Sequence, residues 1–310
     1  MHVPLVRTRI AQLEDLSDAV NAAGLNAFQM SREAPSGNLI HADQAGIAFT
    51  SGRFDSRVQI RGPLSADALS IAVGLRIPPR NRLLLREIDS GVITVFRPGD
   101  EHEAFHDVDS LYAVVTLHEE TLELQAERHG LTLSPNAYRR TSIHPQPLAR
   151  THLEAISRYL TRVHQDNHGQ LDSAAFADIV AAFIGHFARQ PAPLPVVTLR
   201  HRQRVVELTR SHIDQNLDRR LDIEGLALLA GVSRRTLARS FEETLGESPQ
   251  SYIGRMRLHR IRADLLAGGQ QVTVAAVSNR WGISELGRMA ARYRSFFGEP
   301  PSQTRLRGSL

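Results

Sequence analysis

One pattern of residues in the last third of the chain occurs twice, and the two copies lie 52 positions apart. The four residues Leu237, Phe241, Gly246 and Pro249 match Met289, Tyr293, Gly298 and Pro301. A glycine precedes each copy, at Gly231 and Gly282, and these two are 51 positions apart. An internal repeat of this length indicates one supersecondary unit that is used twice. We therefore expect two similar units, with one more residue in the turn of the second.

The spacing within the first copy fits two short helices that cross at a tight turn. Such a pair needs a small residue at the crossing, a glycine four residues later for a left-handed backbone, and a capping residue for the second helix. Ala227, Gly231 and Ser233 have this spacing, and Leu237 and Phe241 follow on one buried face. The sequence predicts a helix-turn-helix unit in each copy.

The region around the repeat is expected to be entirely helical, because apolar residues at helical spacing alternate with glycine, proline and capping residues. The expected helices span His201–Asn216, Asp222–Ala230, Ser233–Thr244, Pro249–Ala267, Val274–Arg280 and Ser284–Phe297. The longest of these should join the two units and face both with Tyr252, Ile253, Met256, Ile261 and Leu265. Prolines 191, 193 and 195 cannot continue a preceding helix. We expect a linker at 191–198 and a separate helical domain at 199–307.

The N-terminal half has the pattern of a β-rich domain. Short apolar runs broken by glycine and proline predict strands of a small sandwich or barrel. These runs are Gly46–Thr50, Val58–Ile60, Leu69–Leu75, Leu83–Ile88, Val92–Phe96 and Leu111–Leu117. Helices should follow at Leu148–His164 and Phe176–Phe187. The fold class is thus α+β, with an N-terminal domain over 1–190. The amphipathic helices between His152 and Phe187 could form a dimer interface, although a domain core would give the same pattern.

The formal charge is divided unevenly between the two halves. Residues 195–310 hold 19 Arg and 11 Asp plus Glu, a net +8, so the rest of the chain holds 18 and 22, a net −4, and together they give the total of +4. The sequence has no lysine. A basic domain beside an acidic one is typical of nucleic-acid binding, because bound phosphates release counterions. A solvated, arginine-rich surface is the alternative.

Several classes of function are disfavoured by what the sequence lacks. It has no cysteine, which excludes disulfides, thiolate metal sites and cysteine nucleophiles. We find no nucleophile triad, phosphate loop or nucleotide fingerprint, and we expect no cofactor. No run of eighteen apolar residues or signal peptide is found, so we expect a cytoplasmic protein that does not engage a membrane.

One segment suggests metal chemistry. Residues 98–106 are similar to the second half of a metal cupin motif, in which His102 and His106 could join carboxylates around a divalent cation. A metal cupin also needs a paired His-x-His on an earlier strand, and His41 stands alone. A turn with satisfied polar residues is therefore the favoured interpretation, and a metal-dependent cupin-type enzyme is the rival. A helical interaction module without DNA binding is a second rival.

The C-terminal residues resemble the AraC/XylS family of transcription regulators over residues 200–307. The resemblance rests on Leu226-Ala227, Gly231-Val232-Ser233, Leu237, Arg239, Phe241, Gly246, Pro249, Tyr252, Arg257-Leu258, Leu265-Leu266, Trp281-Gly282, Tyr293, Gly298 and Pro301. It implies a domain of two helix-turn-helix subdomains joined by one long helix, preceded by a β-rich, cupin-like sensor. It also implies a sequence-specific, effector-responsive activator, no enzyme, with double-stranded DNA, RNA polymerase, a small-molecule effector and a second copy of the chain as partners.

The resemblance also has two departures. Ser278 stands where the second unit usually has a small alanine, and it places a hydroxyl at the helix crossing. Ala291 stands where members often carry arginine, so the second unit is expected to discriminate less between bases, and it could be partly structural.

The side chains expected to touch DNA lie on the outward face of the second helix of each unit. Arg235 and Arg239 are the expected base contacts, because a guanidinium can donate to both acceptors of guanine, and Arg234 is expected on phosphate. In the second unit, Arg288 is the base candidate beside Glu285. Arg292 and Arg294 are expected on the DNA backbone, and Ser233 and Ser284 should cap the two helices.

Overall fold

The computed structural model describes residues 2–21, 24–144, 146–166, 169–189, 194–195, 201–268 and 271–308. The chain divides into two compact units, Met1–Val197 and Thr198–Leu310. Of the expected linker at 191–198, Leu194 and Pro195 form a short strand, and the other residues lie outside the described part of the chain. No helix in the described part is long and apolar enough to span a membrane.

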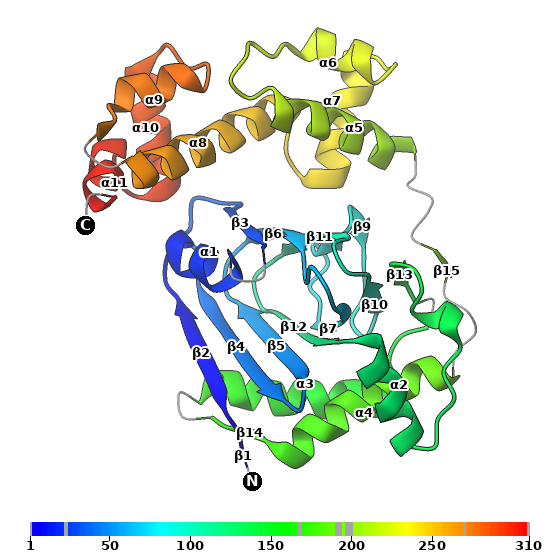
Figure 1. The fold of residues 1–310 in the computed structure, drawn as a ribbon. Helices are drawn as coiled ribbons and strands as arrows, with labels where there is room; N and C mark the ends of the chain where they lie inside the picture. Colours follow the sequence, from blue (N-terminus) through cyan, green and yellow to red (C-terminus); the bar gives the residue numbers. More distant parts are fainter. Residues whose placement is uncertain are drawn as a thin grey trace. The chain divides into compact units, whose positions relative to one another are not determined.

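Two antiparallel sheets form the N-terminal unit and face each other (Figure 1). In spatial order the larger sheet contains β15 (Leu194–Pro195), β13 (Ser142–Ile143), β10 (Ile93–Phe96), β7 (Leu69–Arg76), β12 (Ser110–Leu117), β5 (Ile47–Phe54), β4 (Gly37–Gln44) and β2 (Leu5–Ile10). The smaller sheet contains β3 (Asn26–Gln29), β6 (Val58–Pro63), β11 (Glu101–His106), β8 (Arg82–Leu83) and β9 (Arg86–Glu87). A separate pair joins β1 (His2–Val3) to β14 (Leu171–Asp172).

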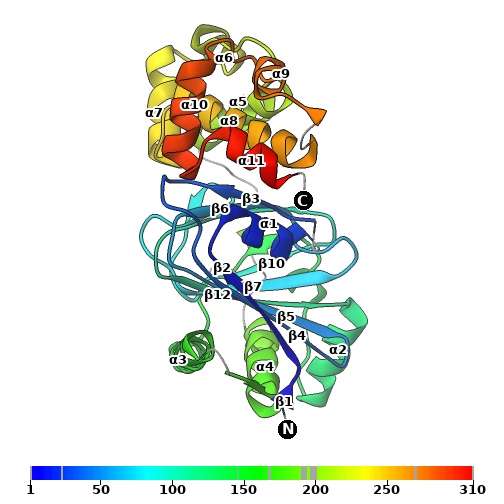
Figure 2. The ribbon, with the colours of Figure 1, turned by 90° about the vertical axis from the view of Figure 1, so that its left-hand side faces the viewer.

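The larger sheet has two different faces, because successive side chains of a strand point to opposite sides. Val115 of β12 pairs with Phe49 on one neighbour and with Ile71 on the other, and all three are buried in one core. This face is covered by α2 (Glu119–Arg128), α3 (Arg150–Gln165) and α4 (Ser173–Arg189), as Figure 2 shows. The core therefore includes Leu160 of α3 and Phe183 of α4. The opposite face points toward the smaller sheet, and α1 (Leu13–Asn21) packs beside β2 and β3.

Most of the expected strands and both expected helices of this unit are present, and its β-rich character is confirmed. Two segments differ from the sequence-based prediction. The segment 82–88 is a hairpin rather than one strand, since Leu84 and Leu85 have φ of 50° and 62°. The segment 101–106, expected as a turn, is strand β11, because β6 and β8 pair with it on its two edges. Of the two interpretations of the amphipathic helices between His152 and Phe187, the apolar residues Ile156 and Leu160 follow the domain core, since both lie in the core of this unit.

The C-terminal unit is helical throughout its described residues. Its helices are α5 (His201–Gln215), α6 (Ile223–Leu229), α7 (Arg234–Leu245), α8 (Pro249–Gly268), α9 (Val274–Arg280), α10 (Leu286–Phe297) and α11 (Pro301–Arg307). The bounds of α9 are those of α6 shifted by 51 positions, and the bounds of α10 are those of α7 shifted by 52. The second turn therefore holds the one additional residue that the sequence predicts.

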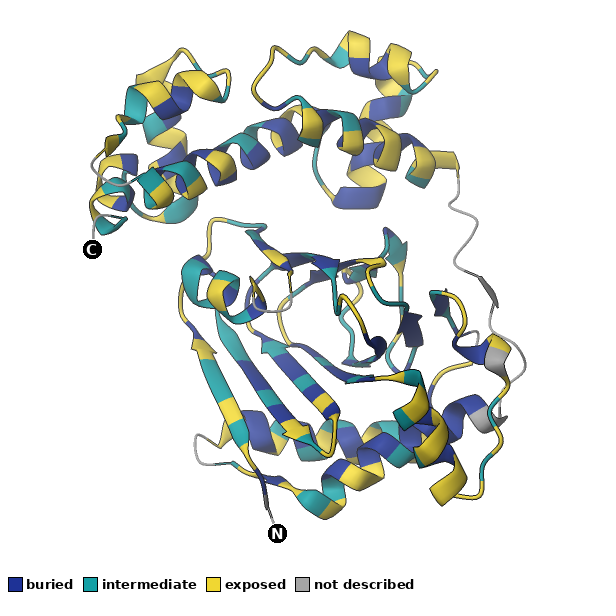
Figure 3. Cartoon of the chain, viewed as in Figure 1, coloured by how far each residue is buried: buried dark blue, intermediate teal, exposed yellow. Residues whose placement is uncertain are grey.

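The long helix α8 is the core of this unit and is buried on several sides (Figure 3). Tyr252 packs on Phe241 of α7, with ring centroids 5.9 Å apart. Further along α8, Ile261 and Leu265 are fully buried with Tyr293 of α10. The prediction that α8 contacts both helix pairs is confirmed.

Candidate nucleic-acid interface

The same turn joins α6 to α7 and α9 to α10. Gly231 and Gly282 have φ of 64° and 68°, a backbone conformation that favours glycine. In the first turn the amide of Val232 donates to the carbonyl of Ala227, and in the second the amide of Ile283 donates to that of Ser278, both at 3.0 Å. These bonds are those of a Schellman C-cap, which ends a helix and reverses the chain direction. The two copies of the repeat thus fold into the same local structure.

The first turn of α7 is capped as the sequence predicts. The Ser233 hydroxyl accepts a hydrogen bond from the amide of Thr236 at 3.1 Å. Leu237 and Phe241 are fully buried, so the opposite face of α7 presents Arg235 and Arg239 to solvent. Arg234 is also exposed, at the first position of the helix.

The start of α10 differs from the prediction. Ser284 does not cap this helix, because α10 begins at Leu286 and its N-cap residue is Glu285, which makes no side-chain capping bond. The additional residue in the turn places Ser284 one position too early for this role. The outward residues are as expected: Glu285 and Arg288 are exposed, whereas Met289 and Tyr293 are buried.

Two of the expected base-contacting arginines lie beside carboxylates of their own helix pair. Arg239 donates to Glu243 at 2.7 Å, and Arg202 of α5 also pairs with this carboxylate. The hydrogen bond from Arg239 holds the pKa of the Glu243 carboxyl below its ordinary value. Arg288 pairs with Glu285 at 2.8 Å. These exposed pairs are screened by solvent and orient the guanidinium groups without fixing them.

The two arginines expected on the DNA backbone have different surroundings. The guanidinium of Arg292 lies against α8 at Gly254, where any side-chain carbon would collide with it. Arg294 is exposed on α10. Arg292 is therefore partly positioned by the absence of a side chain at Gly254.

The structure also shows a polar groove between α8 and the start of α10 that the sequence did not reveal. The groove has a volume of about 220 Å³ and includes Gln250, Arg257, Arg288 and Arg292 among its lining residues. Arg257 donates to the backbone carbonyls of Leu217 and Arg219 in the α5–α6 loop at 3.0 and 2.5 Å. Burial lowers the pKa of Arg257. Arg257 is one of the residues on which the family resemblance rests, but the sequence does not indicate its contact with these carbonyls.

Several arginines of the basic unit are part of its internal structure. Arg255 pairs with Glu247 at 2.6 Å, and Arg262 pairs with Glu299 at 2.9 Å, and both arginine side chains are 6% exposed. Such buried pairs need their partners, because an unpaired buried charge is strongly destabilising. Because each pair is neutral overall, the other charged residues of the unit still carry the net +8.

The departure at Ser278 is accommodated inside α9. Its side chain is fully buried, and its hydroxyl donates to the carbonyl of Val274 at 2.7 Å. Ala291 is exposed on α10 and offers no hydrogen-bonding group. The helix crossing is therefore kept. The outward face of α10 has one polar side chain fewer than it would have with an arginine in place of Ala291.

The histidines that suggested metal chemistry lie in the N-terminal unit on β11. His102 and His106 are both buried, and their side chains point toward the space between the two sheets. Glu103, on the opposite side of the strand, accepts a hydrogen bond from Gln59 at 2.6 Å. Among the described residues, no group of three or more histidine, aspartate or glutamate side chains could hold a metal ion.

The chain is similar to known proteins in its C-terminal unit. A family model described as a helix-turn-helix domain matches residues 226–307. The XylDLEGF operon transcriptional activator of Pseudomonas putida is 40% identical over 103 residues, which are 33% of this chain and 31% of that protein. A probable thc operon regulatory protein of Rhodococcus erythropolis is 30% identical over 126 residues, 40% of this chain and 36% of that protein. This chain spans about a third of the length of these relatives.

A solved structure has the same extent of similarity. It is a probable AraC family transcriptional regulator from Rhodopseudomonas palustris, 35% identical, which covers 34% of this chain and 97% of its own, with a TM-score of 0.33. The residues matched by the family model lie in the unit that holds the repeat. The family model and the sequence relatives show that this C-terminal unit belongs to the AraC/XylS family of DNA-binding transcription regulators.

Proposed function

We propose that the chain recognises a specific DNA sequence through two helix-turn-helix units, α6–α7 and α9–α10, held on α8. The repeated geometry carries this proposal: both pairs have the same C-cap turn, and in both the second helix buries one face and exposes arginines on the other. A helix of this kind places its exposed first turns in the major groove. Two such helices on one spacer would enter successive turns of the groove.

The exposed arginines divide into two roles. Arg235 and Arg239 would donate to guanine in the half-site of the first unit, and Arg288 would do so in the second. Arg234, Arg292 and Arg294 would contact phosphate, together with the amides at the start of α7 beyond Ser233. Glu285 would orient Arg288, since the two are ion-paired, and Ser284 would reach only the backbone.

The role of the whole chain is proposed from its two units. The N-terminal unit would be a cupin-like sensor for a small-molecule effector, because its two facing sheets enclose a cavity. The DNA-bound chain would act as an activator through RNA polymerase, as the names of relatives such as the XylDLEGF operon activator suggest. We also propose that it works as a homodimer, with a second DNA-binding unit contributed by the partner. Sedimentation of the full chain would test the homodimer.

Electrophoretic retardation of duplex DNA by the full chain at several salt concentrations tests the DNA-binding proposal. The DNA site is first selected from a random library with the wild-type chain. The double variant Arg235→Ala/Arg239→Ala should lose discrimination between this selected site and a scrambled duplex. Arg204→Ala, which removes an exposed arginine of α5 outside both helix pairs, should keep that discrimination. Equal discrimination by both variants, or no DNA retention by the folded wild-type chain at low salt, would contradict the proposal.

A further inference from the structure

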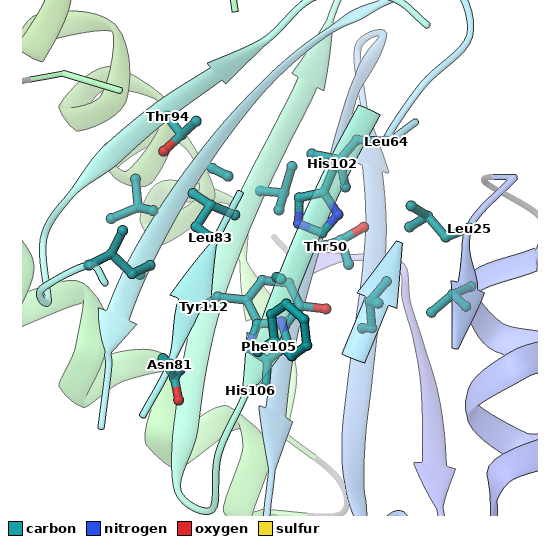
Figure 4. Close-up of a pocket in the computed structure, with 18 of the residues that line it drawn as sticks. Leu25, Thr50, Leu64, Asn81, Leu83, Thr94, His102, Phe105, His106 and Tyr112 are labelled. Carbon is teal, nitrogen blue, oxygen red and sulfur yellow. The ribbon is translucent and has the colours of Figure 1, made fainter. Parts of the chain in front are cut away.

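A cavity of about 110 Å³ lies between the two sheets of the N-terminal unit (Figure 4). Its wall is mainly apolar and includes Leu25, Leu64 and Leu83. It is formed by the face of the larger sheet that α2–α4 do not cover, and by β6, β8 and β11 of the smaller sheet. An apolar cavity of about 150 Å³ holds benzene in another protein, so this one is on the scale of a single ring.

The polar groups in the wall include three buried atoms without a hydrogen-bond partner. They are the Thr94 hydroxyl and the Nδ1 atoms of His102 and His106. Figure 4 shows these three side chains around the same space. A buried polar atom without a partner costs about 1–3 kcal/mol, so most such atoms in proteins are paired. Other hydroxyls of the wall are paired, as Thr116 is with Ser70 at 2.9 Å.

The wall carries little charge that a ligand could use. Burial lowers the pKa of His102 to about 4 and that of His106 to about 3, so both are neutral at pH 7. Burial also lowers the pKa of His41 and raises that of Tyr112 above its ordinary value. The guanidinium of Arg82 pairs with Glu87 at 3.2 Å. No aspartate or glutamate is among the described wall residues, and Glu103 lies on the other side of β11.

The shape of the wall includes a flat aromatic surface. The His106 ring stacks on the Tyr112 ring, with centroids 4.9 Å apart and an interplanar angle of 24°. Tyr112 pairs with Gly52 across the strands, where any side chain would collide with the phenol ring. The missing side chain at Gly52 thus leaves the room that Tyr112 occupies, and the ring stack borders the cavity.

We propose that this cavity binds a small, uncharged and largely apolar molecule that carries a hydroxyl or carbonyl group, which pairs with Thr94 and with His102 or His106. A charged ligand would lose its hydration without gaining a counterion, which is costly in a buried site. This proposal specifies the ligand of the proposed sensor. Only the claim that the ligand regulates DNA binding depends on the proposed function. Binding itself can be measured without DNA.

Thermal unfolding of the full chain with three probes of similar size tests the ligand class. At pH 7.5, millimolar p-cresol should raise the Tm of the N-terminal unit by about 3 °C if its concentration is ten times its Kd. Toluene, which lacks the hydroxyl, should raise it less, and p-toluate, which is anionic, should not raise it. The p-cresol affinity should be the same at pH 7.5 and pH 8.5, because burial lowers the pKa of the wall histidines His41, His102 and His106 below its ordinary value of 6.5.

Two matched variants locate the polar contact. Thr94→Val removes the unpaired hydroxyl, so the Tm of the free protein should not fall, whereas at least half of the p-cresol shift should be lost. Thr116→Val removes a hydroxyl that is already paired with Ser70, so the p-cresol shift should remain even if the Tm of the free protein falls.

Three results would overturn the proposal. They are no Tm shift with p-cresol, a p-toluate shift at pH 7.5 as large as the p-cresol shift, and equal p-cresol shifts in wild type and Thr94→Val. A p-toluate shift of this size at pH 7.5, where p-toluate is an anion, would mean that a cation of the wall serves as the counterion. Failure of DNA binding leaves these readouts unchanged, so the two proposals fail separately.

Discussion

The guanidinium groups of Arg235 and Arg239 lie on the solvent face of α7, opposite the fully buried Leu237 and Phe241. Arginine can donate two parallel hydrogen bonds to guanine, and each such contact favours the correct base by about 1–3 kcal/mol. Within the described part of the chain, only one of the two, Arg239, is paired with a carboxylate. That carboxylate, Glu243, must release or share Arg239 when DNA binds.

We expect Arg239→Ala and Arg235→Ala each to weaken binding to the selected site by about 1–3 kcal/mol and to relax preference at one or two base pairs. Arg234→Ala should instead weaken binding to all DNA sequences alike, because it removes a phosphate contact. It should also reduce the slope of log K against log salt by about one. Titrations of each variant on a matched and a mismatched duplex separate the two effects. A uniform loss in Arg239→Ala would show that this arginine contacts phosphate.

Buried histidines are expected to make the N-terminal unit sensitive to acid. Burial and the nearby Arg7 and Arg53 lower the pKa of His164 to about 3, and burial lowers that of His102 to about 4. Both histidines take up protons in the unfolded chain near pH 6.5, so they favour the folded state above this pH and lose that contribution as the pH falls. Between pH 6.5 and 4.5 the loss is about 2 kcal/mol for each group.

Circular dichroism melts at pH 7 and pH 4.5 test this prediction. The strand signal should melt at a clearly lower temperature at pH 4.5. Trp281 is the only tryptophan of the chain and lies in the C-terminal unit, so its fluorescence reports that unit separately. If the Tm of the strand signal is the same at pH 4.5 and pH 7, these histidines take up protons in the folded protein, and the prediction is wrong.

At the scale of elements, the turn glycines show what the sequence can predict. The equal offsets of the repeat predicted both helix pairs and the additional residue in the second turn, because a left-handed turn needs glycine and a crossing needs a small residue. Ser284 was wrongly expected to cap α10, because the additional residue moves the start of the helix to Leu286. The spacing of residues in the sequence thus predicts that a helix exists more reliably than it predicts the residue at which the helix begins.

Strand β11 shows why the N-terminal unit was harder to predict. Its sequence from Glu101 to His106 is polar and follows a proline and a glycine, which favour a turn. It forms a strand because β6 and β8 supply hydrogen bonds on both sides and because the cavity accepts His102 and His106. The internal ion pairs of the buried Arg255 and Arg262 could not be predicted either, since only tertiary contacts distinguish these arginines from surface ones.

Two glycine substitutions test the turn. Gly231→Ala should destabilise the C-terminal unit by about 1 kcal/mol, because its φ of 64° strains any residue with a side chain, although nothing lies within 4 Å of the new carbon. Gly287→Ala is the matched control: it also has free space but an ordinary helical backbone, so it should stabilise α10 by about 0.5 kcal/mol. Denaturant unfolding followed at Trp281 measures both. Equal effects of the two substitutions would show that the turn is not strained.

At the scale of the whole molecule, the two units are expected to divide the work. The repeat and the exposed arginines lie in Thr198–Leu310, and the cavity lies in Met1–Val197. Removal of residues 1–190 should therefore change the effector response or the oligomeric state more than the intrinsic affinity for DNA. A promoter assay with the full and shortened chains tests this, and identical activation by both under all growth conditions would contradict it.

The central claim is that α7 and α10 enter the major groove of one duplex, about 10–10.5 bp apart, and that α7 discriminates more between bases. Binding of the full chain to a library with randomised positions, at rising salt, tests it most directly. For each DNA-binding unit we expect two selected segments at this spacing. The segment contacted by α7 should be the more stringent because Ala291 cannot donate a hydrogen bond, and each unit should contribute about −3 to the slope of log K against log salt from three phosphate contacts. One selected segment, two segments at another spacing, or equal stringency in both would contradict the account.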